Sequence, residues 1–184
     1  MIEAVSLTDD VVLRLATEQD AEAMLRAYVR NRDHLRPWEP SRPDEFYTRR
    51  GQARRLEHVL AQQAEGRAVP WVLADGDEIV GRMTLNNIVR GPWLSADLGY
   101  WTDARYTGRG LATKAVAEVC RMADEDMSLH RIAAGTLLHN AASQSVLLKC
   151  GFEAYGVAPR YLEIDGKWQD HRLFQRILND RPAL

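Results

Sequence analysis

Arg105-Tyr106-Thr107-Gly108-Arg109-Gly110 is the stretch that decides the fold, because it lies between an apolar segment ending near Trp101 and a helical pattern beginning at Leu111. Glycine has no Cβ, so an anion can approach the backbone N–H groups, and the start of a helix is electropositive. A strand, a glycine turn and a helix in this order predict a pyrophosphate site. Taken alone, the turn fits a plain helix opening equally well.

The loop differs from the two best-known nucleotide loops. No Gly-Lys-Ser/Thr follows it, which excludes a Walker loop. The segment Gly110-Leu111-Ala112-Thr113 lacks the third glycine of a dinucleotide fingerprint. The anion site is therefore expected in another class of fold.

A second motif, Asn140-Ala141-Ala142-Ser143, begins a short helix one helix and one strand after the loop, and Gly151-Phe152 follows that helix. Asn140 and Ser143 are also ordinary residues for the start of a helix, so a capping role stays open for each. The spacing of the two motifs is more specific than either motif alone.

Together the motifs resemble the GNAT superfamily of N-acetyltransferases, whose loop reads Gln/Arg-x-x-Gly-x-Gly/Ala and whose later helix begins Asn-x-x-Ser. Within it, His34-Leu35-Arg36-Pro37-Trp38 and Tyr161-Leu162-x-x-x-Gly166-x-Trp168-x-Asp170-His171 resemble the RimJ/RimL branch, which acetylates the N-terminal amines of ribosomal proteins. The resemblance covers nearly the whole chain.

The resemblance implies an α/β (α+β) fold with a mixed, strongly twisted central sheet flanked by about four helices. Its fourth and fifth strands splay apart, and by position these are Ala96–Trp101 and Ile132–Leu137. We expect one N-acetyltransferase domain over residues 1–184, since no interior stretch has the composition of a linker.

Hydrophobic periodicity and turn residues predict the elements. The expected helices run from the capping box Thr17–Asp20 to about Arg30, from near Asp44 to Ala64, from Leu111 towards Met127, and over Ala141–Lys149. The expected strands are Val11–Leu15, Val69–Ala74, Glu78–Asn87, Ala96–Trp101, Ile132–Leu137, Phe152–Val157 and His171–Leu178. Two prolines make His34–Pro40 an expected loop.

The resemblance also implies how acetyl-CoA, the acyl donor, would be held. Backbone groups of Leu98, Gly99 and Tyr100 would bind the pantetheine and the acetyl carbonyl. Asn140 and Ser143 would contact the cofactor arm and its sulfur. The pyrophosphate would be surrounded by the loop and the first helical turn, namely Arg105, Tyr106, Thr107, Gly108, Arg109, Gly110, Leu111 and Ala112.

Direct acyl transfer needs a neutral amine, a carbonyl held by donors and a proton for the leaving thiolate. Many superfamily members supply that proton from a Tyr later in the Asn-x-x-Ser helix, but Leu147 stands there. The resemblance therefore implies Ser143 as the acid, with Tyr100 beside the carbonyl. No base stands out, because Arg160 occupies a position where a related enzyme has a carboxylate; Glu163 and Asp97 are more commonly solvated acids, and a water chain would suffice.

The expected acceptor is a protein N-terminal α-amine. At pH 7 an α-amine is roughly a tenth neutral, whereas a lysine amine is neutral at about one part in a few thousand. Arg36, Trp38, Tyr161 and Glu163 are the expected substrate-binding residues, although Trp38 is equally typical of a packing anchor. A small-molecule amine acceptor and a non-catalytic acyl-CoA-binding module stay open as alternatives.

Composition excludes several other classes. A net charge of -2 and a pI near 6.2 argue against nucleic acid or anionic lipid as a partner. No apolar run reaches membrane length, and the two cysteines are typical of a reducing compartment, so a cytoplasmic protein is expected. The histidines lack ligand spacing, so no metal is expected. A homodimer is a further expectation from the resemblance.

Overall fold

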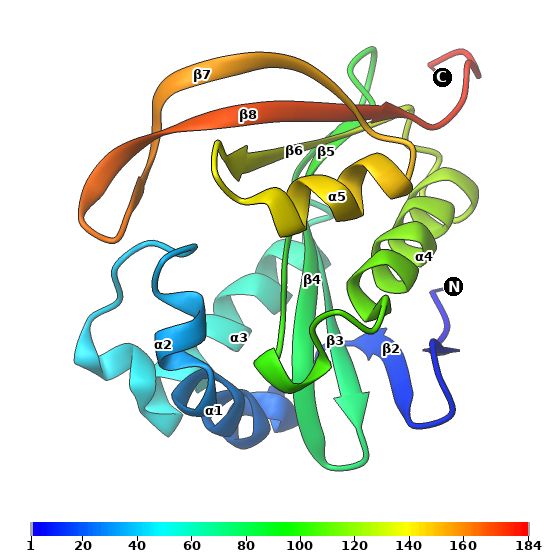
Figure 1. Ribbon diagram of the computed structural model, residues 1–184. Coiled ribbons are helices and arrows are strands. Elements are labelled where there is room, and N and C mark those ends of the chain that lie inside the picture. Colours follow the sequence, from blue (N-terminus) through cyan, green and yellow to red (C-terminus); the bar gives the residue numbers. More distant parts are fainter. Residues whose placement is uncertain (1, 184) are drawn as a thin grey trace.

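The computed structural model describes residues 2–183 and contains one eight-stranded sheet with helices on both faces (Figure 1). The strands are β1 (Val5–Ser6), β2 (Val11–Leu15), β3 (Val69–Asp75), β4 (Glu78–Val89), β5 (Ser95–Thr102), β6 (Arg131–Leu137), β7 (Glu153–Ile164) and β8 (Lys167–Ile177). The helices are α1 (Ala21–Arg30), α2 (Arg32–Leu35), α3 (Arg49–Ala64), α4 (Leu111–Glu125) and α5 (Ala141–Lys149), with 3-10 turns η1 (Glu18–Asp20), η2 (Asp44–Tyr47) and η3 (Ala104–Tyr106).

The expected splay of two central strands is confirmed at β5 and β6. The sheet order is β1-β2-β3-β4-β5-β6-β8-β7, and β5 with β6 form its parallel pair. That pairing runs from Ser95↔Arg131 to Asp97↔Ala133 and then stops, although both strands continue. Beyond Asp97, one edge of β5 therefore faces an opening in the middle of the sheet.

Alternation along the strands builds a core on each face of the sheet. Trp71 and Leu73 of β3 join the cluster that includes the apolar stripe of α4. Val72, between them, points to the opposite face and joins the cluster with α1 and α3. The sheet thus separates α4 and α5 from α1, α2 and α3, as Figure 1 shows.

The segment between α1 and β3 differs from the expectation. The expected helix from Asp44 to Ala64 is a 3-10 turn, η2, followed by α3, because Thr48 is extended (φ -125) and caps α3 by accepting from the Gly51 amide at 3.0 Å. The expected loop at 34–40 begins inside the short helix α2, which ends ahead of Pro37. The described chain therefore has five α-helices rather than about four.

The closing hairpin is longer than expected. β7 continues past Val157 to Ile164, and β8 begins at Lys167 rather than His171. Most of β7 is exposed, so it has little of the apolar alternation by which a strand is recognised. Asp165 and Gly166, both at positive φ, make the turn, which brings the hairpin tip over the segment after α2 (Figure 1).

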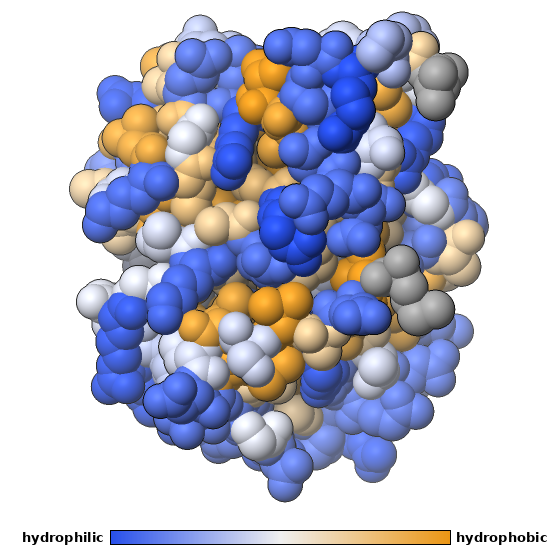
Figure 2. Space-filling view, turned by 90° about the vertical axis from the view of Figure 1, so that its right-hand side faces the viewer, coloured by the Kyte–Doolittle hydropathy of each residue, from blue (hydrophilic) through white to orange (hydrophobic). Residues whose placement is uncertain are grey.

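Figure 2 views the molecule from the side of α4 and shows a band of hydrophilic side chains between two areas where apolar side chains gather. No helix within residues 2–183 is both long and apolar enough to cross a membrane.

Candidate active site

The glycine loop forms the open start of α4. Gly108 and Gly110 have φ of +74° and +75°, a conformation that other residues adopt at a cost. Gly110 is the N-cap of α4, and within residues 2–183 no side chain caps this helix. Backbone N–H groups of the first turn are therefore available to an anion at the positive end of the helix. The loop fits the pyrophosphate of acetyl-CoA.

A buried carboxylate, Asp103, positions this loop, and sequence reasoning missed it. Its oxygens accept from Arg30 Nε at 2.7 Å, Asn31 Nδ2 at 3.0 Å and the Arg105 amide at 2.9 Å. Burial alone would raise the pKa of Asp103, but hydrogen bonds from Arg105, Asn31 and Arg30 outweigh it and hold the pKa well below its usual value. Asp103 thereby ties the loop to the end of α1.

Three of the expected loop residues are engaged within the protein. The Arg105 guanidinium contacts Asp103 at 3.1 Å and Glu78 at 2.8 Å, and these hydrogen bonds raise its pKa. Tyr106 donates its hydroxyl to Asp75, and the Arg109 guanidinium lies 5.6 Å from the centre of the Tyr106 ring. These contacts hold the loop side chains against the neighbouring residues of the protein.

Two hydroxyl groups meet beside the opening in the sheet. The Tyr100 hydroxyl of β5 lies 2.8 Å from Ser143 Oγ of α5. Asn140 holds the start of α5 by accepting from the Ser143 amide at 3.1 Å, which is the capping role that the sequence left open. Burial raises the pKa of Tyr100 to about 12, although its hydrogen bond to Ser143 opposes the rise. Tyr100 is thus a neutral phenol near pH 7 that can donate to Ser143.

Leu147 is fully buried, so α5 presents no side chain from that position to the opening. Leu98, Gly99 and Tyr100 occupy the part of β5 that lies beyond its pairing with β6. Their backbone edge and the Ser143 hydroxyl therefore border the same opening from β5 and α5.

Two of the four expected substrate residues lie at the carboxyl end of β6. The Trp38 ring centre is 5.4 Å from that of His139, which immediately precedes Asn140. The Tyr161 ring centre is 5.4 Å from that of His171, which pairs with Leu137. Tyr161 also covers Gly135, where an added Cβ would come within 3.5 Å of its ring.

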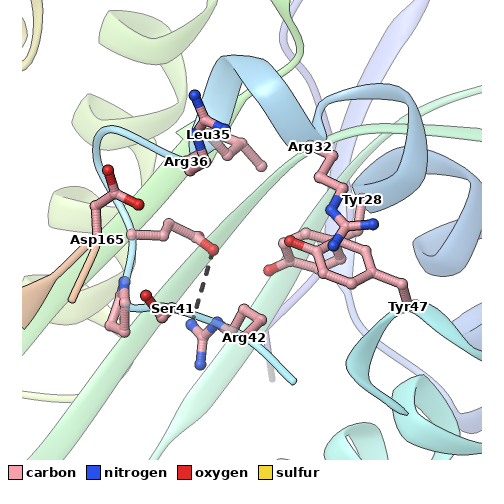
Figure 3. Close-up of a pocket in the computed structure, with 10 residues that line it drawn as sticks. Tyr28, Arg32, Leu35, Arg36, Ser41, Arg42, Tyr47 and Asp165 are labelled. Atoms are coloured by element: carbon pink, nitrogen blue, oxygen red, sulfur yellow. Dashed lines mark ion pairs between the residues drawn. The ribbon is translucent and has the colours of Figure 1, made fainter. Parts of the chain in front are cut away.

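The other two lie elsewhere. Glu163 is exposed and pairs with Trp168 near the tip of the hairpin, while Arg36 lines a separate pocket between α2 and that tip (Figure 3). Asp97 accepts from Asn87 Nδ2 at 2.8 Å and is exposed. Burial and the nearby Asp97 charge both raise the pKa of Tyr161.

A family model described as an acetyltransferase (GNAT) domain matches residues 10–153. The chain belongs to this family and is an acetyl-CoA-dependent N-acetyltransferase, as the glycine loop, the splayed strands and the Asn-x-x-Ser helix indicated.

Its relatives include the "[Ribosomal protein uS5]-alanine N-acetyltransferase" of Escherichia coli (strain K12), which is 36% identical over 168 residues, 90% of this chain and 87% of the relative. The ribosomal-protein-S5-alanine acetyltransferase of Vibrio fischeri superposes with a TM-score of 0.93 at 33% identity, covering 98% of this chain and 100% of that one. Mycobacterium smegmatis RimJ in complex with CoA-disulfide has a TM-score of 0.87 at 34% identity, covering 91% and 81%. The resemblance to the RimJ/RimL branch is confirmed.

Proposed function

We propose that this acetyltransferase transfers acetyl from acetyl-CoA to the N-terminal α-amine of a protein, a ribosomal protein in particular. The observation that carries the proposal is the Tyr100–Ser143 hydroxyl pair beside the opening between β5 and β6, in a chain whose relatives acetylate the alanine of a ribosomal protein. The pair supplies a proton where β5 and α5 flank the opening.

Residues of the loop and of β5 hold the donor. Amides from Gly108 to Ala112 bind the pyrophosphate, and the backbone of Leu98, Gly99 and Tyr100 holds the pantetheine arm and orients the carbonyl. Acetyl-CoA supplies the acetyl group as a thioester. Asn140 keeps the first turn of α5, and with it Ser143, at the opening.

Ser143 Oγ donates the proton that the departing sulfur needs, and the Tyr100 hydroxyl donates to Ser143 Oγ in turn. A phenol with a pKa of about 12 is a weak acid, but it stays protonated through the neutral range and so keeps this donation available. Leu147 has no side-chain proton to donate to the sulfur.

An N-terminal amine makes small demands on a base. With a pKa near 7.7 to 8.0, roughly a tenth of it is neutral at pH 7, so water can accept the remaining proton. Trp38 and Tyr161, at the carboxyl end of β6, form the walls that orient the incoming chain.

We further propose that the enzyme acts in the cytoplasm, where its two buried free cysteines, Cys120 and Cys150, stay reduced. A homodimer stays a prediction.

Release of free CoA tests the acceptor. The purified protein is given acetyl-CoA with a peptide that begins with alanine, the same peptide acetylated at its N-terminus, a peptide with a lysine as its one free amine, and free polyamines. We expect CoA release with the unblocked peptide and background release with the blocked one. Turnover of the polyamines alone would overturn the proposal.

A further inference from the structure

A pocket of about 140 Å³ lies between the end of α1, α2, the segment after α2 and the tip of the β7–β8 hairpin (Figure 3). Its lining includes Arg32, Arg36, Glu39, Arg42, Tyr47 and Asp165. The Asp165 amide donates to the Glu39 carbonyl at 3.4 Å, so the hairpin tip and the segment after α2 contact each other and together form one side of the pocket.

The lining carries more positive than negative charge. The lining contains three arginines, Arg32, Arg36 and Arg42, and two carboxylates, Glu39 and Asp165. Glu39 is already paired with Arg42 at 3.7 Å, the ion pair drawn as a dashed line in Figure 3. Arg32 and Arg36 are therefore left with Asp165 as the one remaining carboxylate of the lining.

Arg32 lies 4.2 Å from the centre of the Tyr47 ring and 3.5 Å from the fully exposed Asp44, a pair that solvent screens. Arg32 and Arg42 form ion pairs, whereas Arg36 has no carboxylate within 4.0 Å among residues 2–183. It is free to bind an anion that enters the pocket.

A further arginine, Arg82, lines a second pocket, together with Arg55 and Gln52, and does not line this one. Arg82 pairs with Trp101 in register, which puts it on the sheet face that α1 and α3 cover. Burial lowers the pKa of Arg82, and the Arg55 charge lowers it further. Within residues 2–183, Arg82 Nε and Arg42 Nε are both buried without a hydrogen-bond acceptor. Buried guanidinium N–H groups without acceptors are costly, and a carboxylate is their best-matched partner.

The pocket adjoins the site of acetyl transfer. The segment that lines it also carries Trp38, which contacts His139 next to Asn140 at the start of α5. A chain in extended conformation advances about 3.3 Å per residue, so a peptide following this wall would reach the pocket within a few residues of its N-terminus.

We propose that this pocket binds an acidic side chain of the acceptor polypeptide, a few residues after the N-terminal amine, and that the enzyme therefore selects N-termini with an Asp or Glu at that position. The inference rests on the proposed function, since it supposes a polypeptide acceptor. Arg36 and Arg42 are the specificity-determining residues, and Arg42 is shared between the ligand and Glu39.

The test is a glutamate scan. Peptides begin with alanine and carry Glu at one following position at a time, each matched by a peptide with Gln at that position. CoA release gives KM and kcat for each peptide. At one position the Glu peptide should have a KM about tenfold below that of its Gln partner, with kcat nearly unchanged, and added salt should shrink the difference.

Arg36→Gln and Arg42→Gln should each bring the Glu-to-Gln ratio of KM towards one at that position. Arg50→Gln, on the exposed face of α3, is the matched control and should keep the ratio of the unaltered enzyme. Thermal unfolding of each variant checks the fold; Arg36 is exposed, so its variant should unfold like the parent.

The outcomes distinguish failure of the acidic selection from failure of the proposed peptide acetylation. A ratio near one at every position, or a ratio that persists in both Arg36→Gln and Arg42→Gln, would overturn the acidic selection while leaving peptide acetylation intact. Turnover of no peptide, with turnover of free amino acids instead, would overturn the proposed function and assign the pocket to a small carboxylate.

Discussion

The glycine loop and the arginine pocket both suit anions, but they do so in opposite ways. In the proposed site the loop offers backbone N–H groups from one contiguous stretch, Gly108 to Ala112, at the start of α4. The pocket uses side chains that α1, α2, the segment after α2 and the hairpin tip bring together. The residues of the loop are adjacent in the sequence, whereas the residues of the pocket come together only when the chain folds.

The difference has a functional meaning. Backbone amides do not change with the side chain, so the loop suits a donor that every member of the family shares. Side-chain guanidinium groups can be exchanged one by one, which suits an acceptor that differs between enzymes. Variants on the donor side should therefore affect all acceptors equally, whereas variants on the acceptor side should discriminate between them.

The largest effect is expected at Ser143, on the donor side. Ser143→Ala removes the proposed proton donor, so kcat should fall by about 10² or more for every acceptor, with little change in the affinity for CoA. Steady-state kinetics and CoA titration measure the two. Ser145→Ala, exposed on the same helix, is the control. An unchanged kcat in Ser143→Ala would remove Ser143 from this role.

Asp103 should produce the next largest effect, because it braces the loop from a buried position with a side chain only 1% exposed. Asp103→Asn leaves Arg30 without its buried partner and should lower the free energy of unfolding by about 3 kcal/mol near pH 7. Urea unfolding measures this value. Asp126→Asn, an exposed acid at the end of α4, should change it little.

The effect of Asp103 should depend on pH in a known direction. Its pKa is lowered in the folded state, so its contribution is complete above the unfolded pKa of about 3.9 and is lost as the pH falls below that value. The stability gap between the unaltered protein and Asp103→Asn should therefore narrow in acid. A gap that is constant between neutral pH and pH 3 would show that the charge of Asp103 is not its cause.

Gly110 tests the loop itself. Its φ of +75° costs a residue with a Cβ about 1 to 2 kcal/mol, and the added methyl group would stand where the anion approaches. Gly110→Ala should lose that much stability and bind CoA more weakly with every acceptor present. Gly156→Ala is the control, because Gly156 lacks positive φ and has no atom within 4 Å of an added Cβ. Equal CoA affinity in the two variants would contradict the anion-binding role.

The same contrast explains which parts of the molecule the sequence could predict. α5 was predicted over its full range, since Asn140 caps its start and Gly151, at φ +78°, follows its end. Caps of this kind can be recognised from adjacent residues, without knowledge of the tertiary structure. β7 was predicted too short because its exposed residues give no alternation, and the role of Asp103 depends on Arg30 and Asn31, far away along the chain.

The arginine pocket lay beyond sequence reasoning for the same reason. Arg36 was expected to contact substrate from the family resemblance alone, but nothing adjacent in sequence connects it with Asp165. The contact between the hairpin tip and the segment after α2 brings these two residues into one pocket. Propensity and periodicity carry no information on such contacts.

The smallest effect is expected at Trp38, on the acceptor side. Trp38 is 37% exposed and contacts His139, so Trp38→Ala should cost little stability. KM for an N-terminal peptide should rise by about three- to tenfold, while the affinity for CoA stays unchanged, since only the acceptor wall is lost. Trp93→Ala, at a more exposed tryptophan in the β4–β5 connection, serves as the control. If Trp38→Ala weakened CoA binding as much as peptide binding, the division of the site into a donor side and an acceptor side would be wrong at this residue.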